Sequence, residues 1–243
     1  MTRHRECKSD ICRVLSAEDW RERLPELAEM PPDRAVGALL SLRLDPDEAL
    51  RWRAVAGFGV VVPAMAERDI NEARKVFGRF MWMMNEESGN IGWGLPEAMG
   101  EIMANHEGLA EEYHQKLASF IQQPESFGDD NYMDHPPLRE ATYWGLARLA
   151  QVRPDLVEQA AGDMIVHLDH EEASELLKSL LVEETAAGKG YICWALGLMA
   201  YKNARAAVEK HADSNAAVRI FRNLEFEDTT LGAMAREALE RMD

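Results

Sequence analysis

The 243-residue sequence has few cysteines, and no long apolar run is evident in it. Its three cysteines, Cys7, Cys12 and Cys193, are too few for a disulfide framework. An uninterrupted apolar stretch of membrane-spanning length is missing, and the polar N-terminus (TRHRECKSDICR) lacks the apolar core of a signal peptide. We therefore expect a cytoplasmic protein that has no membrane partner.

Positive charge is also scarce, because 27 basic residues face 43 acidic ones and give a net charge of −16. Nonspecific binding to phosphate backbones relies on clustered Lys and Arg, so we expect no nucleic-acid partner. The sequence contains no Walker loop, nucleotide-binding glycine fingerprint, HExxH motif or nucleophile elbow. The composition therefore predicts no cofactor, and it favours a non-enzymatic protein over an enzyme.

What the sequence does contain is one pattern that occurs four times. It reads RWRAVAGFGVVV at 51–62, GWGLPEAMGEIM at 92–103, REATYWGLARLA at 139–150 and KGYICWALGLMA at 189–200. When the copies are aligned on Gly59, Gly100, Ala147 and Gly197, each anchor follows a large apolar residue. The anchors lie 41, 47 and 50 residues apart. A helical segment that recurs at this period is typical of stacked helix pairs.

The four segments resemble the inner helices of HEAT repeats, which carry spaced Ala followed by Ala-Leu-Gly-x-Leu. Residues 194–200 (WALGLMA) match best, and residues 98–102 and 145–149 are close variants. The resemblance covers roughly residues 33–212. It implies a curved α-solenoid whose inner helices line a concave face. Most HEAT proteins are protein-binding scaffolds, although a few relatives are DNA glycosylases or bilin lyases.

We therefore predict an all-α superhelix of about four to five helix pairs that forms a single domain over residues 1–243. An N-terminal segment and helix (1–32) would precede the repeats (33–212), and a hairpin with a helix (213–243) would cap the last repeat. The polar residues 1–15 are expected to be loosely ordered. An additional helix within 169–184 would account for the longest spacing between anchors.

Several local signals set the expected element boundaries. Pro63 is predicted to end or kink the first motif helix, and Gly188 and Gly190 to break the chain before the fourth. Residues 217–229 (AVRIFRNLEFEDT) alternate with period two around Arg222-Asn223, which predicts a β-hairpin. Thr230 is predicted to cap the last helix.

Four of the six tryptophans share one stripe in the motif alignment. Trp52 and Trp93 stand seven positions before their anchors, whereas Trp144 and Trp194 stand three before, which places all four on one helix face. We predict a concave aromatic groove for a protein or peptide partner, with charged side chains at its edge. The predicted binding residues are Arg51, Trp52, Glu86, Glu87, Trp93, Glu97, His135, Arg139 and Trp144. In the alternative interpretation, the Trp rings pack between repeats as core.

Other residues support weaker hypotheses. Glu86, Glu87 and His135 lie in loops that lead into motif helices and could serve a lyase-like or glycosylase-like enzyme in the same groove. The spacing of His167, His170 and Glu171 would suit a metal if all three lay on one helix, but Asp169 reads as a helix boundary. No metal site is therefore predicted. The Met-rich residues 80–84 are interpreted as core or as an adaptable binding surface.

Overall fold

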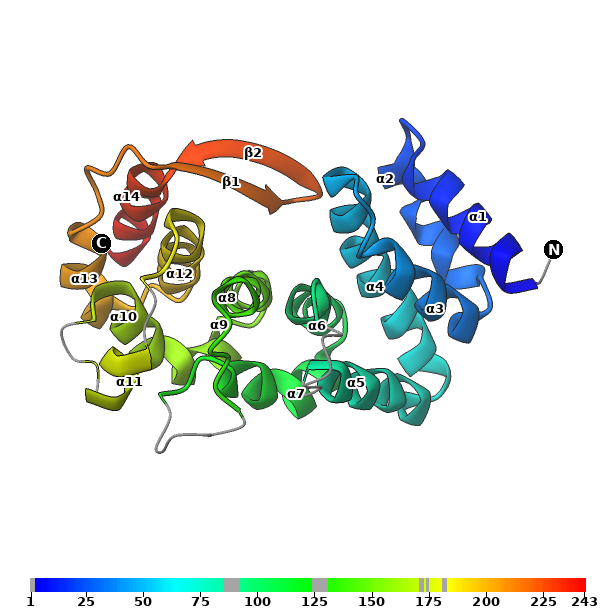
Figure 1. The fold of residues 1–243 in the computed structure, drawn as a ribbon, viewed down its shortest axis with the longest axis horizontal. Coiled ribbons are helices and arrows are strands. Elements are labelled where there is room, and N and C mark those ends of the chain that lie inside the picture. Colours follow the sequence, from blue (N-terminus) through cyan, green and yellow to red (C-terminus); the bar gives the residue numbers. More distant parts are fainter. Residues whose placement is uncertain (1–2, 85–91, 124–130, 171–172, 174, 181–182) are drawn as a thin grey trace. The chain divides into compact units, whose positions relative to one another are not determined.

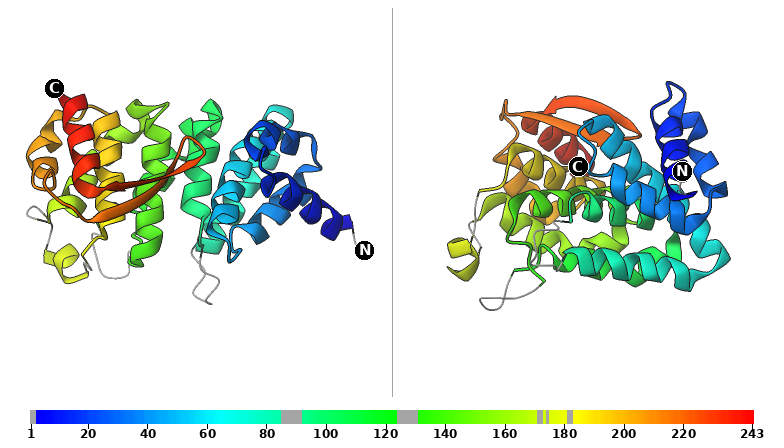
Figure 2. Two further views of the ribbon diagram at one scale, coloured as in Figure 1. Left: turned by 90° about the horizontal axis from the view of Figure 1, so that it is seen from above. Right: turned by 45° about the vertical axis from the view of Figure 1, so that its right-hand side comes forward.

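The computed structural model describes residues 3–84, 92–123, 131–170, 173, 175–180 and 183–243 (Figures 1 and 2). By its internal contacts the chain divides into two compact units, Met1–Glu107 and Gly108–Asp243, called here the N-terminal and C-terminal units. The prediction of one domain over residues 1–243 stays a prediction.

The N-terminal unit consists of helices around one long central helix. Its elements are α1 (Arg3–Leu15), α2 (Trp20–Arg23), the 3-10 helix η1 (Leu24–Glu29), α3 (Pro32–Leu42), α4 (Glu48–Arg68), α5 (Ile70–Met84) and α6 (Leu95–Ala104). Helix α4 carries the first motif and packs against η1, α3, α5 and α6. It begins at an N-cap, since the Asp47 carboxylate accepts a hydrogen bond of 2.9 Å from the amide of Ala49.

One prediction for this unit is wrong, and one of the two alternatives offered for Pro63 is excluded. Residues 3–15 form helix α1 instead of a loose segment, because Ile11, Val14 and Leu15 on one face are buried in the unit. Pro63 does not end α4, which continues to Arg68. Proline removes one backbone hydrogen bond from the helix, but Pro63 is buried within α4, which packs against α1, η1, α3, α5 and α6.

The C-terminal unit adds helices and one hairpin. Its elements are α7 (Glu107–Ser119, whose first residue belongs to the other unit), α8 (Pro136–Ala150), α9 (Pro154–Val157), η2 (Glu158–Ala160), α10 (Ala161–Asp169), α11 (Glu175–Leu180), α12 (Ala186–Leu198), η3 (Lys202–Ala204), α13 (Arg205–Glu209), β1 (Ala217–Arg222), β2 (Glu225–Thr230) and α14 (Leu231–Met242). Helix α12 carries the fourth motif and packs against α8, α14 and β1. Within 169–184, the described helix beyond the end of α10 is the short α11.

The motif anchors lie where helices approach closely. A Cβ added at Gly59 would stand 2.6 Å from Cγ of Glu101 on α6, and one added at Gly197 would stand 2.6 Å from Cα of Ala238 on α14. The first motif helix packs on the second (α4 and α6), and the third packs on the fourth (α8 and α12). These contacts confirm the helical-repeat fold class, with small residues at the anchors because a side chain would keep the helices apart.

The predicted hairpin and last helix are confirmed. Strands β1 and β2 pair antiparallel from Ala217↔Thr230 to Arg222↔Glu225. The turn lies one residue later than predicted, at Asn223 and Leu224, whose φ angles of 53° and 64° are those of a tight hairpin turn. The Thr230 hydroxyl then caps α14 by accepting from the amide of Ala233 at 3.1 Å.

Gly188 and Gly190 lie inside α12 and do not break the chain before it. The helix is begun by Thr185, whose hydroxyl accepts from the amide of Gly188 at 3.0 Å. A Cβ at Gly190 would stand 2.7 Å from Sδ of Met234, so this glycine lets α14 pack closely on α12. The two glycines therefore serve packing and capping of the helix.

Helix α4 is long and apolar enough, by length and composition, to cross a membrane. Two thirds of the apolar window (67%) is buried inside the structure, and core helices pass the same test. The expectation of no membrane partner, which rested on the absence of a long apolar run, stays a prediction.

Candidate functional site

The predicted binding residues are distributed over both units, and each unit is considered by itself. Glu86 and Glu87 lie outside the described residues. Arg51, Trp52, Trp93 and Glu97 belong to the N-terminal unit. His135, Arg139 and Trp144 belong to the C-terminal unit.

Arg51 and Trp52 lie near the start of α4 and are both half-buried. The Arg51 guanidinium donates to the backbone oxygens of Asp45 at 2.9 Å and Pro46 at 3.1 Å. This side chain therefore fixes the loop that leads into α4, which is a structural role, and it offers only part of its surface to a partner.

Trp93 is held in place through its backbone while its side chain is 39% exposed. The guanidinium of Arg43, itself buried, donates to the carbonyl oxygen of Trp93. Gly94 follows with φ of 74°, and a Cβ there would lie 3.4 Å from Cβ of Arg43. Burial lowers the pKa of Arg43 to about 10 and outweighs the half-buried Glu97 carboxylate, whose negative charge raises the pKa of Arg43. Arg43 thus positions an exposed aromatic ring at the entry to α6.

Trp82 on α5 is the most exposed of the large apolar side chains in the described part of the chain, at 63%. One face of α5 is exposed along its length, because its residues follow one another at helical spacing and all are exposed: Asn71, Lys75, Gly78 and Trp82. Phe80 and Met83 point the other way and are buried, so the Met-rich run 80–84 is partly core and partly surface.

The cations of the same helix lie beside this stripe. Arg74 and Arg79 are exposed, and Lys75 pairs with Glu72 at 2.5 Å. Arg74 donates to the Asn71 side chain at 3.1 Å. We call Arg74, Lys75, Arg79, Trp82 and Trp93 the tryptophan face. Sequence reasoning missed Trp82 and Arg79, although the spacing with polar Asn71 and Lys75 could have indicated an exposed position.

The end of α5 and the segment before α6 meet in the structure. A Cβ added at Gly92 would stand 2.6 Å from Cγ of Met84, so the two segments are in close contact. This contact brings Trp82, two residues before Met84, and Trp93, one residue after Gly92, to the same end of the N-terminal unit. Both exposed rings therefore lie near this end of the unit, although Trp82 projects from a different side of α5 than Met84, which makes the contact.

In the C-terminal unit the prediction of a surface groove is wrong for Arg139 and Trp144. Arg139 is 0% exposed and Trp144 1% exposed. The indole N–H of Trp144 donates to the carbonyl oxygen of Phe221 on β1 at 2.8 Å, and its ring lies 6.5 Å from that of Trp194. The hairpin covers this part of the stripe, so here the alternative interpretation of core packing holds.

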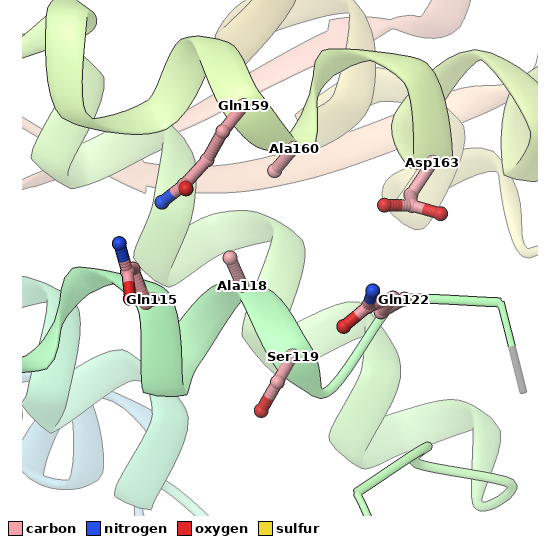
Figure 3. Close-up of a pocket in the computed structure, with 7 residues that line it drawn as sticks. All are labelled: Gln115, Ala118, Ser119, Gln122, Gln159, Ala160 and Asp163. Atoms are coloured by element: carbon pink, nitrogen blue, oxygen red, sulfur yellow. The ribbon is translucent and has the colours of Figure 1, made fainter.

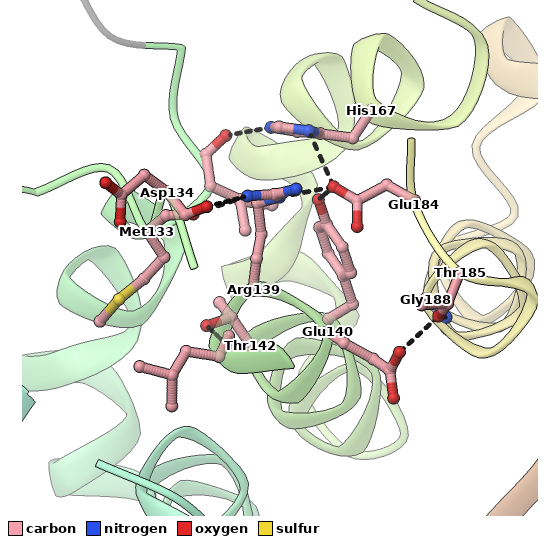
Figure 4. A network of polar contacts seen from close by, with 12 residues as sticks. Met133, Asp134, Arg139, Glu140, Thr142, His167, Glu184, Thr185 and Gly188 are labelled. Carbon is pink, nitrogen blue, oxygen red and sulfur yellow. Dashed lines mark hydrogen bonds and ion pairs between the residues drawn. The ribbon is translucent and has the colours of Figure 1, made fainter. Parts of the chain in front are cut away.

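Arg139 belongs to a buried polar cluster centred on Glu184 (Figure 4). Oε1 of Glu184 accepts from Arg139 Nε at 2.5 Å and from the Tyr143 hydroxyl at 2.9 Å. Nδ1 of His167 lies 3.5 Å from the same oxygen, while Nε2 of His167 lies 2.9 Å from the carbonyl oxygen of Ile121. Arg139 also donates to the Met133 carbonyl at 2.8 Å. The cluster ties α8, α10 and the segments at 121, 133 and 184 together.

The cluster shifts the pKa values of its members. Burial by itself raises the pKa of Glu184, but His167 and Arg139 outweigh it, so the pKa is lowered and the carboxylate is the favoured form. Burial raises the pKa of Tyr143 well above its usual value. It also raises to about 12 the pKa of Tyr132, whose ring stacks on His167 at 5.9 Å between centroids. These side chains contact one another within the interior, so the arrangement serves stability.

The residues proposed for catalysis or metal binding do not form a site in the described structure. His135 is half-buried at the residue before α8. His170 ends α10 with φ of 60°, which takes it off the helical face of His167, and Glu171 lies outside the described residues. Among the described residues no group of three His, Cys, Asp or Glu side chains could hold a metal ion.

Each unit has a pocket lined by described residues. One of about 200 Å³ in the N-terminal unit lies beside Met65, Arg68 and Glu72. The other, of about 280 Å³, lies in the C-terminal unit between α7 and the η2–α10 segment (Figure 3). The second pocket is rich in amide side chains, and sequence analysis gave no indication of it.

No family model and no curated protein matches the sequence. Its structural neighbours are armadillo- and HEAT-like repeat proteins over nearly the full length. A designed armadillo repeat protein is 14% identical, with a TM-score of 0.46 over 96% of this chain and 99% of that chain. An engineered protein is 14% identical, with a TM-score of 0.44 over 98% and 96%. A HEAT-like repeats protein from Thermococcus onnurineus NA1 is 13% identical, with a TM-score of 0.32 over 97% and 96%.

Proposed function

We propose that this protein is a non-enzymatic interaction protein that binds a segment of a protein partner on the tryptophan face of its N-terminal unit. The observation that carries the proposal is Trp82, whose large ring is 63% exposed on a helix that also presents Arg74, Lys75 and Arg79. A large exposed aromatic surface costs solvation free energy in the isolated protein, and that cost is recovered when a partner covers the ring.

The charge of α5 indicates the chemistry of the partner. The chain as a whole carries −16, yet α5 presents three cations, Arg74, Lys75 and Arg79, against one acidic side chain, Glu72, which is 41% exposed and pairs with Lys75. An acidic segment would gain from these cations, and an apolar side chain within it would pack on Trp82. Trp and Arg dominate interface energetics because both bury large areas and give specific contacts. The expected partner is therefore an acidic peptide segment with an aromatic or aliphatic anchor.

Trp93 supplies the second anchor of the face. Its backbone is fixed by Arg43 and by the left-handed turn at Gly94, so the ring loses little conformational freedom when it is covered. We propose this smaller face in place of the predicted groove, because Arg139 and Trp144 are buried and cannot contact a partner.

Selection from a random peptide display library on the purified chain tests this proposal. We expect enriched peptides with Asp or Glu next to an apolar residue, whose affinity falls about ten-fold or more in Trp82→Ala, as is usual for a central aromatic in an interface. Val152→Ala is the matched control, because Val152 is 49% exposed in the other unit. Binding that survives both Trp82→Ala and Trp93→Ala, or no enrichment on the wild type, would contradict the proposal.

A further inference from the structure

The pocket in the C-terminal unit is lined mainly by hydrogen-bonding side chains. Gln115, Ala118, Ser119 and Gln122 come from α7 and the turn after it, and Gln159, Ala160 and Asp163 come from η2 and α10 (Figure 3). In the close-up, the amides of Gln115 and Gln159 point toward each other, and Asp163 stands above Gln122.

Several of these polar groups are available to a ligand. Gln115 and Gln122 make no side-chain hydrogen bond within the part of the chain that the structure describes. Gln159 donates from its nitrogen to the Leu156 carbonyl at 3.4 Å, which leaves its amide oxygen to accept. Oδ1 of Asp163 accepts from the backbone amide of Gln123 at 3.2 Å, so the second carboxylate oxygen can accept another donor. The pocket thus offers several acceptors around one negative charge.

The Asp163 carboxylate is half-buried and has no cation beside it in the lining. Burial raises the pKa of Asp163, which means that its charged form has lost part of its hydration. None of the described residues that line the pocket is basic. The C-terminal unit contains 13 basic and 24 acidic residues, a net charge of −11, and this field attracts cations toward its surface.

We propose that this pocket binds the guanidinium group of an arginine side chain presented by a partner. A guanidinium is a planar cation with five N–H donors, so it can bind the Asp163 carboxylate and glutamine oxygens together. Ala118 and Ala160 are small, and they leave room for the flat face and the methylene stem. An anion is disfavoured by Asp163, and a divalent metal ion would require more carboxylate ligands than this single one.

This inference is independent of the tryptophan face, because every lining residue lies in the C-terminal unit. Its first test is an NMR titration of the wild-type chain with arginine blocked at both ends. Blocked citrulline, which has nearly the same shape but no charge, serves as the matched ligand. We expect blocked arginine to shift the side-chain amide signals of Gln115, Gln122 and Gln159, and blocked citrulline to bind about ten-fold or more weakly, because charge-assisted hydrogen bonds are stronger.

The second test uses Asp163→Asn, which keeps an acceptor for the Gln123 amide but removes the charge. Affinity for blocked arginine should fall about ten-fold or more. Asp155→Asn is the control, because Asp155 is exposed, pairs with Arg153 at 2.8 Å and does not line the pocket. Trp82→Ala should leave this binding unchanged, which separates the pocket from the proposed function.

Three results would overturn the inference. They are equal affinities for blocked arginine and blocked citrulline, arginine-induced shifts confined to signals outside the pocket, and unchanged affinity in a folded Asp163→Asn variant. If that variant does not fold, as judged by circular dichroism, the comparison of arginine with citrulline on the wild type decides. Binding of blocked lysine as tightly as blocked arginine would assign the pocket to cations in general and overturn its selectivity for guanidinium.

Discussion

The two units of the chain organise their interiors differently. In the N-terminal unit, the central helix α4 buries mainly apolar side chains such as Phe58 and Val62. In the C-terminal unit, helix α8 carries Arg139 and Tyr143 into the interior, where both contact Glu184. A repeated sequence motif thus allows different interiors, because the motif sets the spacing of small and large residues while other segments decide what the remaining faces contact.

Charge and exposure also distinguish the units. The N-terminal unit has 14 basic and 19 acidic residues, a net charge of −5, against −11 for the C-terminal unit. Four large apolar residues are exposed in the described part of the chain: Leu44, Trp82 and Trp93 belong to the N-terminal unit, and Val152 belongs to the other. This contrast agrees with the proposal of an apolar anchoring face in the first unit and a cation-binding pocket in the second.

The largest expected effect comes from breaking the buried ion pair. Arg139→Ala leaves Glu184 buried without its main partner, and removal of one member of a buried pair typically costs about 3–5 kcal/mol of unfolding free energy. Urea denaturation followed by circular dichroism measures this. Arg205→Ala removes an exposed pair with Asp243 (2.6 Å) and should leave the midpoint nearly unchanged. Equal effects of the two changes would show that the cluster does not stabilise the C-terminal unit.

A smaller effect is expected from filling a close contact between helices. Gly197→Ala places a Cβ 2.6 Å from the backbone of Ala238, so α12 and α14 must separate, at a cost of about 1–3 kcal/mol. Gly162→Ala in α10 is the control, since a Cβ there meets nothing within 4 Å. It should raise the thermal midpoint slightly, because alanine is the better helix former. If Gly162→Ala lowered the thermal midpoint while Gly197→Ala left it unchanged, the packing described for α12 would be contradicted.

The smallest predicted effect concerns acid stability. The folded-state pKa of Glu184 is lowered below the ordinary value of 4.5, so its contribution is fully present above that pH. The contribution is lost as the pH falls through the folded-state pKa. Unfolding free energy measured from pH 6 downward should therefore decrease less steeply in Glu184→Gln than in the wild type, although this variant is less stable at neutral pH. An unchanged slope would exclude Glu184 as a source of the acid sensitivity.

The repeat architecture could be predicted from the sequence, because small residues at Gly59 and Gly197 have a direct steric consequence in any close helix packing. The hairpin at 217–229 could also be predicted, since an alternation of period two is distinct from that of a helix. The exposure of individual side chains could not. Trp93 and Trp144 hold related positions in the motif, yet one is 39% exposed and the other 1%.

The difference between these two tryptophans has a local and a long-range cause. Trp93 precedes the helix that begins at Leu95, so the helical register used to align the motif does not apply to it. Trp144 is within α8, and its ring is covered by a strand that follows 77 residues later. Neither fact follows from the spacing of residues within the motif.

What the sequence by itself determined is the type and order of most elements after α1, because period, caps and small anchor residues act over a few residues along the chain. Only the tertiary structure decided which polar side chains are internal and which aromatic rings remain outside. Arg139 and Glu184 are 45 residues apart, and neither shows by its neighbours that it will be buried against the other. Pairing of this kind depends on the packing of α8 and α10 around them, as does the amide-lined pocket between α7 and α10.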